Sequence, residues 1–284
     1  MQWQGRRSSG NVEDQRGGGG IGGIVGFGGI GTLVIAAIVY FLGGDPSQVL
    51  QQGQMANPVT NNAPIQQTAE EKELAEFVGV VLADTEDVWN TLFKQINQQY
   101  REPKLVLFTG QVQSACGGAS AAIGPFYCPG DEKAYIDLSF YNELKNRFGA
   151  GGDFAMAYVI AHEIGHHVQN QLGISDKVNA MRGKLSETDF NKLSVKQELQ
   201  ADFFAGIWAH YNQKMKNVIE AGDIEEALTA ANAIGDDALQ KQAQGYVVPD
   251  AFTHGTSAQR IKWFKLGYET GDLGKGDTFN TTDL

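Results

Sequence analysis

AHEIGHHVQ, residues 161–169, is the stretch of this chain that predicts both a fold and a chemistry. His162 and His166 lie four residues apart, so on an α-helix their imidazoles project from one face and can bind a single metal ion. Glu163 lies between them and fits the HExxH pattern, in which the glutamate is not a ligand but acts as general base toward a metal-bound water. A buried helix whose two histidines are hydrogen-bonded is the alternative interpretation.

A second stretch, VKQELQADFFAG at residues 195–206, can complete such a site. A catalytic zinc ion keeps one position open and has three protein ligands, for which two histidines and a glutamate are an established set. Glu198 can supply the third ligand. Asp202 follows one helical turn later and can accept the free ring N–H of a ligand histidine. A solvated acidic helix face is the alternative, but the neighbouring residues are strongly apolar, which favours a buried site.

HEIGHH followed by ELQADFFAG resembles the gluzincin peptidases, in which HExxH and a downstream ExxxD provide two histidines and a glutamate for zinc. More closely, the chain resembles the bacterial family of predicted membrane-anchored neutral zinc metallopeptidases. The resemblance extends from the Gly-rich N-terminus and its apolar segment through CGGASAAIGPFYCPGDEKAYIDLSFY and QGYVVPDAFTHGTSAQR to the end of the chain. It implies a zincin-like fold, peptide hydrolysis and one Zn²⁺ ion per chain.

The resemblance also suggests roles for two residues in THGTSAQR, residues 253–260. The carbonyl of a peptide under attack develops negative charge, which a histidine or arginine donor can stabilise by about 3 kcal/mol. Gluzincins use a histidine for this purpose, and THGTSAQR is similar to a His-and-Arg segment of related integral-membrane peptidases. We therefore expect His254 to stabilise the oxyanion and Arg260 to support its charge. Gly255 departs from the more common proline, and a surface-loop histidine followed by a helical arginine is the alternative.

Length, composition and net charge limit the kinds of protein that this chain can be. A chain of 284 residues with 42% apolar residues has room for one sizeable domain with a packed core, plus appendages. Its formal net charge of −11, without a basic patch that is interleaved with aromatic residues, argues against a nucleic-acid partner.

The first 67 residues are expected to lie outside that domain. Residues 1–20, with three arginines and a run of four glycines, are predicted to form a disordered cytoplasmic tail. Residues 21–42 contain no charge and are long enough to cross a bilayer as one transmembrane helix. A cleavable signal peptide is the alternative, although its apolar core should be shorter. Residues 43–67, rich in Gln, Asn and Pro, are typical of a flexible linker.

The charges beside the apolar segment predict its orientation. Arg6, Arg7 and Arg16 precede it and Asp45 follows it. The positive-inside bias therefore places the N-terminus in the cytoplasm and the domain on the outer face of a bacterial plasma membrane, as a single-pass protein. Glycines in the segment would allow close helix approach, so a homodimer through them is a further expectation.

The domain itself, residues 68–284, is expected to be α+β: mainly helical, with a small mixed sheet. Thr68 and Glu71 form the capping-box pattern at the start of an amphipathic helix. Residues 104–110 and 133–138 are strand-like, with turn residues at their borders.

Cys116 and Cys128 are the two cysteines of the chain and lie between these strands. The predicted extracytoplasmic location favours a disulfide, whereas zinc ligation would need a second Cys or His pair at suitable spacing. Residues 119–127 are a candidate strand edge for binding extended substrate through the main chain, with a structural hairpin as the alternative.

Together these features predict a membrane-anchored zinc endopeptidase that acts on peptide or protein substrates, with Glu163 as general base. Two other functions stay open. A catalytically inert zinc-binding module would have no use for Glu163 or His254. A zinc amidase that acts on a cell-wall amide would use the same residues on another substrate.

Overall fold

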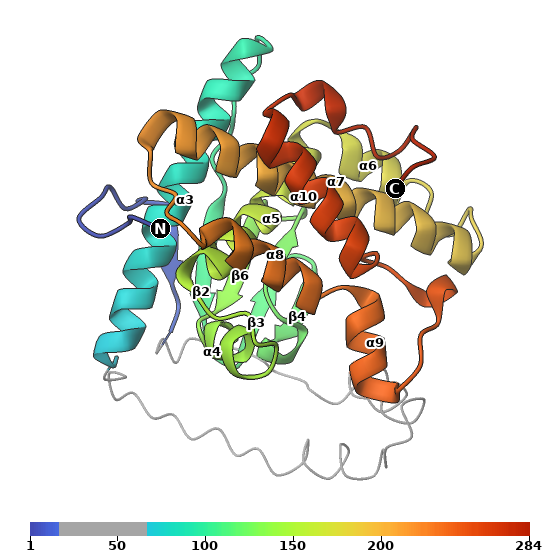
Figure 1. Ribbon diagram of the computed structural model, residues 1–284, viewed down its shortest axis with the longest axis horizontal. Coiled ribbons are helices and arrows are strands. Elements are labelled where there is room, and N and C mark those ends of the chain that lie inside the picture. Colours follow the sequence, from blue (N-terminus) through green and yellow to red (C-terminus); the bar gives the residue numbers. More distant parts are fainter. Residues whose placement is uncertain (17–66) are drawn as a thin grey trace. The chain divides into compact units, whose positions relative to one another are not determined.

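The HEIGHH motif lies on α5 (Asp153–Gln171), which packs against α7 (Glu187–Lys216) and α8 (Asp223–Ala233). The computed structural model describes residues 1–16 and 67–284, which form one compact unit (Figure 1). The described residues are mainly helical with a small mixed sheet, as expected for an α+β fold. The other helices are α3 (Ala69–Gln95), α4 (Ser139–Asn146), α6 (Ile174–Asn179), α9 (Asp236–Gln244) and α10 (Ser257–Thr270).

The four-stranded sheet has the order β1-β2-β6-β5. The strands β1 (Val12–Asp14), β2 (Lys104–Phe108) and β6 (Lys133–Asp137) are parallel, while β5 (Phe126–Cys128) is antiparallel to β6 and ends the sheet. Both strands predicted from sequence are present. A separate hairpin joins β3 (Gln111–Ser114) to β4 (Gly117–Ser120), and Cys116 and Cys128 form the predicted disulfide.

Residues 1–16 belong to the folded domain, so the prediction of a disordered tail over residues 1–20 is wrong for them. Val12 of β1 pairs with Leu105 of β2. Arg6 forms an ion pair of 2.6 Å with Asp84, which is buried in α3. The α-amino group of Met1 lies 2.7 Å from Asp153, the first residue of α5. Arg6 and Arg7 look like part of a solvated tail in the sequence because their acidic partners lie about eighty positions further along the chain.

The other two N-terminal arginines, Arg7 and Arg16, also have acidic partners in the domain. Arg7 pairs with Glu86 and Asp87 of α3, and Arg16 pairs with Asp14. The three arginines on which the orientation was based therefore have partners within the domain. Their presence before residues 21–42 is explained by the fold and carries less weight as a topology signal.

The borders of the undescribed stretch, Arg16 and Gln67, lie at one place in the domain. Nη1 of Arg16 donates to the carbonyl oxygen of Glu71 at 3.2 Å, and Nε2 of Gln67 donates to Asp14 at 3.3 Å. A single crossing of a bilayer about 30 Å thick would separate these partners. The predicted orientation, with the N-terminus in the cytoplasm and the domain outside, would place these partners on opposite faces of the membrane and stays a prediction.

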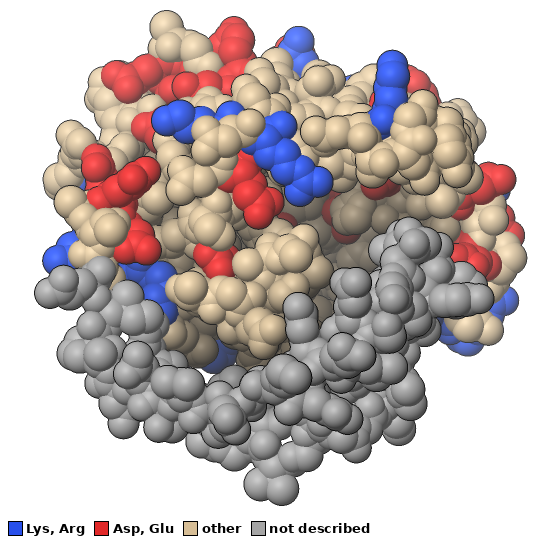
Figure 2. Space-filling model, turned by 90° about the horizontal axis from the view of Figure 1, so that it is seen from below, with Lys and Arg blue, Asp and Glu red and all other residues tan. Residues whose placement is uncertain are grey.

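The predicted transmembrane helix at residues 21–42, its proposed dimer contact and most of the linker at 43–67 lie outside the described residues. No helix within residues 1–16 and 67–284 combines the length and apolarity needed to cross a bilayer. Helix α3 begins where the sequence predicted, because Thr68 caps it and forms the capping box with Glu71. In the coloured part of the face drawn in Figure 2, acidic and basic side chains are interspersed.

Candidate metal centre

Two helices bring the three predicted ligands together. His162 and His166 project from α5, and Glu198 projects from α7. The Nε2 atoms of His162 and His166 lie 3.2 Å and 3.4 Å from Oε2 of Glu198. A tetrahedral zinc ion with bonds of about 2.0–2.1 Å needs ligand atoms about 3.3–3.4 Å apart. The donor set and its spacing therefore fit zinc.

Gly165, in the middle of the motif, makes this approach of the two helices possible. A Cβ atom added to Gly165 would lie 2.9 Å from the carbonyl oxygen and 3.1 Å from the Cα atom of Ala201 on α7. Backbone atoms cannot move aside as a flexible side chain can. A larger residue at this position would push α7 away from α5 and carry Glu198 away from the histidines.

The second ring nitrogen of each histidine is held by an oxygen acceptor. Nδ1 of His162 lies 2.8 Å from Oδ1 of Asp202, and Nδ1 of His166 lies 2.9 Å from Oε1 of Gln169. A neutral imidazole that donates from Nδ1 has its lone pair on Nε2. The acceptors hold both rings in the orientation that presents Nε2 to a metal ion, and with the Nδ1 proton kept in place each Nε2 can bind the ion once it carries no proton itself.

Arg260 does not accompany His254 as expected but lies behind the metal ligands. Its guanidinium donates to both carboxylate oxygens of Asp202, at 2.9 Å from Nε and 3.1 Å from Nη2. Tyr158 donates to Asp202 as well, at 2.6 Å. Burial alone would raise the pKa of Asp202, but Arg260 and His162 lower it to about 2. Asp202 is therefore a charged, fully buried link between Arg260 and the ligand His162.

Glu163 and the three ligands line one cavity of about 650 Å³. The carboxylate of Glu163 has no hydrogen-bond partner within residues 1–16 and 67–284, so it is free to meet a molecule in this cavity. Strand β5 forms part of the same wall. The candidate edge at residues 119–127 is not one continuous strand, because the 3₁₀ turn Ala121–Ile123 separates β4 from β5.

His254 lines this cavity too, although its side chain is half exposed. Asp236, at the start of α9, holds its loop by accepting from the backbone N–H groups of Thr253, His254 and Gly255 at 2.7, 2.6 and 3.0 Å. The other carboxylate oxygen lies 3.2 Å from Nδ1 of His254. Burial lowers the pKa of His254, but Asp236 and Glu198 raise it above its ordinary value, which favours a ring that donates from both nitrogens.

Comparison with known proteins agrees with this arrangement. Residues 1–279 match the family described as "Putative neutral zinc metallopeptidase". The chain belongs to this family. It is 48% identical to the uncharacterized protein YpfJ of Escherichia coli (strain K12), over 98% of this chain and 99% of that protein. It is 40% identical to the uncharacterized protein Rv2575 of Mycobacterium tuberculosis, over 86% and 85%. No solved structure matches the chain.

The charges around the three predicted ligands predict how zinc binding depends on pH. Burial lowers the pKa of His162, but Asp202 and Glu198 raise it to about 10, so this ring is protonated at pH 7 in the zinc-free protein. Zinc must displace that proton, so raising the pH favours zinc. We expect at least one proton to be released per zinc bound, and the zinc Kd to fall about tenfold from pH 7 to pH 8.

A pH-indicator dye in weakly buffered solution measures the released protons, and competition with a fluorescent chelator measures the Kd at each pH. A pH-independent Kd without proton release would contradict this assignment of His162.

Several residues that shape the centre were not identified from the sequence. Tyr158 lies four residues before His162, and Gln169 lies three residues after His166, so helical spacing could have placed both on the ligand face. Asp236 and Gln200 had no such signal. Their partners are distant in sequence: the packing of α5 against α7 brings Gln200 to Gln169, and the packing of α9 beside α10 brings Asp236 to the loop of His254.

Proposed function

We propose that this chain is a zinc-dependent endopeptidase. The observation that carries the proposal is the position of Glu163 in the same cavity as three side chains whose donor atoms are spaced for zinc. When bound, zinc would lower the pKa of a coordinated water and polarise a substrate carbonyl. A domain that only stored zinc would gain nothing from a glutamate that lines the cavity beside the ligands without being one of them.

Each residue then has one task. His162, His166 and Glu198 would hold the ion, with the imidazoles oriented by Asp202 and Gln169. Glu163 would take a proton from the attacking water and return it to the leaving amine, a role that depends on hydrogen-bond reach more than on an unusual pKa. His254 would donate to the carbonyl oxygen as it gains negative charge.

The position of β5 at the end of the sheet, in the wall of the cavity, supports an extended peptide as substrate. Strand β5 ends the sheet, pairs with β6 on one side only and lines the cavity. A peptide could add to that edge through main-chain hydrogen bonds, which would give affinity with little sequence preference. A cell-wall amide is the second candidate substrate, since the same catalytic atoms would serve it.

Restoring zinc to the zinc-free full-length protein should restore cleavage of a mixed peptide library. Mass spectrometry would identify the cut bonds, and muropeptides tested in parallel would separate the two substrate classes. Cleavage of the muropeptides alone would favour the amidase. Zinc binding without any cleavage would favour the inert module.

For localisation we propose the extracytoplasmic side of a bacterial plasma membrane, for residues 1–16 and 67–284 alike. The disulfide supports an oxidising compartment. Membrane attachment through residues 21–42 is proposed from the sequence only. The contacts of Arg16 with Glu71 and of Gln67 with Asp14 support a position of both borders of residues 17–66 on one side.

Thiol labelling tests this arrangement. We expect Gln4→Cys and Thr282→Cys, both at exposed positions, to react equally with a membrane-impermeant maleimide in intact spheroplasts. A known cytoplasmic cysteine, labelled only after lysis, is the control. Labelling of Thr282→Cys alone would restore the single-crossing orientation and contradict the pairing of β1 with β2.

A further inference from the structure

The third histidine of the HEIGHH motif, His167, has no task in the reaction proposed above. It is fully buried on α5, about 100° around the helix from the ligand His166. Its Nε2 atom lies 2.6 Å from the carbonyl oxygen of Arg101, and its Nδ1 atom lies 2.9 Å from the hydroxyl oxygen of Tyr127. A carbonyl can only accept, so Nε2 carries the proton. Burial lowers the pKa of His167 to about 4, so the ring is neutral at pH 7 and Nδ1 accepts from Tyr127.

The hydroxyl of Tyr127, on strand β5, is held by α5 at two positions. Asn170 lies three residues after His167 on the same helix face and donates to the hydroxyl oxygen at 3.2 Å. Burial raises the pKa of Tyr127, so the hydroxyl keeps the proton that it donates to His167. The two rings also meet edge to face, with 5.5 Å between their centroids. Within residues 1–16 and 67–284, no other side-chain hydrogen bond joins β5 to α5.

The other partner of His167 is fixed as well. Oε1 of Gln171 accepts from the backbone N–H of Arg101 at 2.9 Å, and Nε2 of Gln171 donates to the carbonyl oxygen of Arg101 at 2.9 Å. The ring of Tyr100 packs edge to face against His167, with 5.6 Å between the centroids. The imidazole therefore has one orientation, in which Nδ1 is directed at Tyr127.

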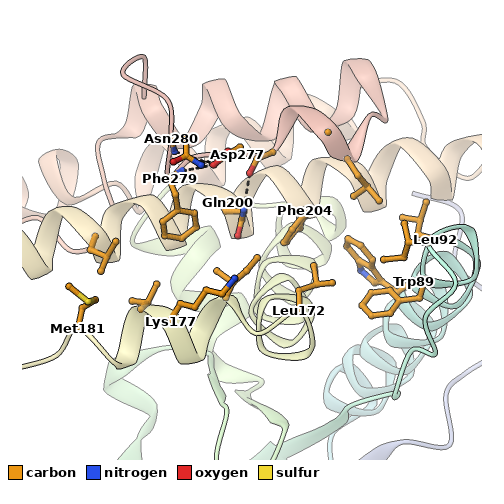
Figure 3. A pocket seen from close by; sticks show the side chains of 18 residues that line it. Trp89, Leu92, Leu172, Lys177, Met181, Gln200, Phe204, Asp277, Phe279 and Asn280 are labelled. Carbon is orange, nitrogen blue, oxygen red and sulfur yellow. Dashed lines mark hydrogen bonds between the residues drawn. The ribbon is translucent and has the colours of Figure 1, made fainter.

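Residues 166–171 of α5 thus reach two different neighbours. On one side, Gln169 lies 2.9 Å from Nδ1 of His166 and donates to Gln200 of α7 at 3.1 Å. Gln200 lines a separate cavity of about 610 Å³ (Figure 3). On the other side, His167 and Asn170 reach β5. One turn of helix therefore carries both a metal ligand and the contact to the end strand of the sheet.

The position of β5 matters because Tyr127 lines the catalytic cavity together with His162, Glu163 and His166. In the proposed function an extended peptide adds to the free edge of β5. The separation of that edge from the metal ligands then determines where the scissile carbonyl lies. A misplacement of about 1 Å can lower the rate of an enzymatic reaction about 10²-fold.

We propose that His167 is a positioning residue for peptide hydrolysis, which acts through Tyr127 to hold β5 at a fixed place beside the metal ligands. The inference rests on the proposed function, since it concerns a peptide that lies along β5. His167 touches neither the substrate nor the metal ion. The adjacent histidines of the motif have separate tasks: His166 presents Nε2 to the ion, and His167 places the strand that binds the substrate.

Hydrogen exchange of the zinc-loaded, full-length protein tests whether this contact holds β5. Tyr127→Phe removes only the hydroxyl, and we expect the peptic fragment that spans β5 to exchange about threefold faster because the strand opens more often. Tyr135→Phe is the matched control. Tyr135 lies on β6 opposite Phe126, and its hydroxyl donates to Asp131 instead of a residue of α5. This control should change the exchange of β5 less than Tyr127→Phe does.

Cleavage kinetics test the consequence for catalysis. Fluorescein-labelled casein can lie along β5, whereas furylacryloyl-glycyl-leucinamide is too short to do so. Tyr127→Phe and His167→Leu should lower kcat/KM for casein about tenfold and change it for the short substrate by less than about twofold. Chelator competition should give an unchanged zinc Kd, and circular dichroism checks folding.

Two further variants distinguish positioning from a general loss of structure. The double variant Tyr127→Phe with His167→Leu should be no slower on casein than the slower single variant, because both changes remove the same hydrogen bond. His167→Gln should recover part of the activity that His167→Leu loses, because its amide can donate to a carbonyl and accept from a hydroxyl.

The outcomes separate this inference from the proposed function. Unchanged exchange of β5 in Tyr127→Phe, an equal effect of Tyr135→Phe, the same loss on both substrates, or additive losses in the double variant would overturn the positioning role. A zinc-loaded wild type that cleaves neither substrate would contradict the peptidase function. The exchange measurement would then decide by itself whether His167 holds β5.

Discussion

Replacing Glu163 with glutamine should lower kcat/KM for peptide cleavage by about 10²–10⁴-fold and leave zinc binding unchanged. The amide has nearly the same shape as the carboxylate but cannot accept the proton of the attacking water. Because Glu163 is not among the ligands, the spacing of His162, His166 and Glu198 is preserved. Zinc content by atomic absorption and peptide turnover on the same preparation measure the two effects independently.

Glu143→Gln provides a matched control, because Glu143 lines the same cavity and undergoes the same chemical change. We expect its turnover to stay within about threefold of wild type, as for a side chain that takes no part in proton transfer. A Glu163→Gln variant that cleaves as fast as wild type would falsify the general-base assignment. A variant that loses zinc together with activity would show that Glu163 contributes to metal binding instead.

Removing Asp202 should be the most destabilising single change at the metal centre. The side chains of Asp202 and Arg260 are 0% and 4% exposed, and Asp202→Ala would leave the guanidinium buried without its partner. Breaking a buried ion pair from one side costs about 3–5 kcal/mol. Loss of the acceptor for Nδ1 of His162 should also weaken zinc binding by about 10–100-fold.

Urea unfolding of the zinc-free protein measures the free energy of unfolding, and chelator competition measures the zinc Kd. The double variant Asp202→Ala with Arg260→Met should be less destabilised than the sum of the single variants, because the two residues are coupled. Asp283→Ala, which breaks the exposed ion pair with Lys262, should cost only about 0–1 kcal/mol. A similarly small cost for Asp202→Ala would show that water or another group replaces the carboxylate.

The metal ligands could be placed from sequence because their relations are local. Residues four apart on one helix share a face whatever the rest of the fold does, so His162 with His166 and Glu198 with Asp202 needed only helical spacing. The start of α3 at the Thr68 cap was equally local, since a capping box is complete within four residues. The spacing of residues within two separate helices was therefore sufficient to indicate a zinc site with His162, His166 and Glu198 as ligands.

The sequence led to a wrong interpretation of residues 1–16 for the opposite reason. A short arginine-containing segment before a glycine run has the composition of a disordered tail. Its order comes from pairing with β2 and from ion pairs with Asp84 and Glu86, whose positions local propensity cannot specify. The predicted orientation across a membrane rests on the same arginines, which it treats as free charges although the fold pairs them with acidic residues.

Taken alone, the sequence determined the chemistry of the centre: which side chains can hold zinc, which can move a proton, and that two helices carry them. The tertiary structure decided what surrounds that chemistry. It placed Arg260 behind Asp202, linked His166 through Gln169 to Gln200 on α7, and paired Val12–Asp14 with β2. The spacing of residues along one helix determines which side chains project from the same face. Contacts between segments that are distant in sequence depend instead on how all the helices pack.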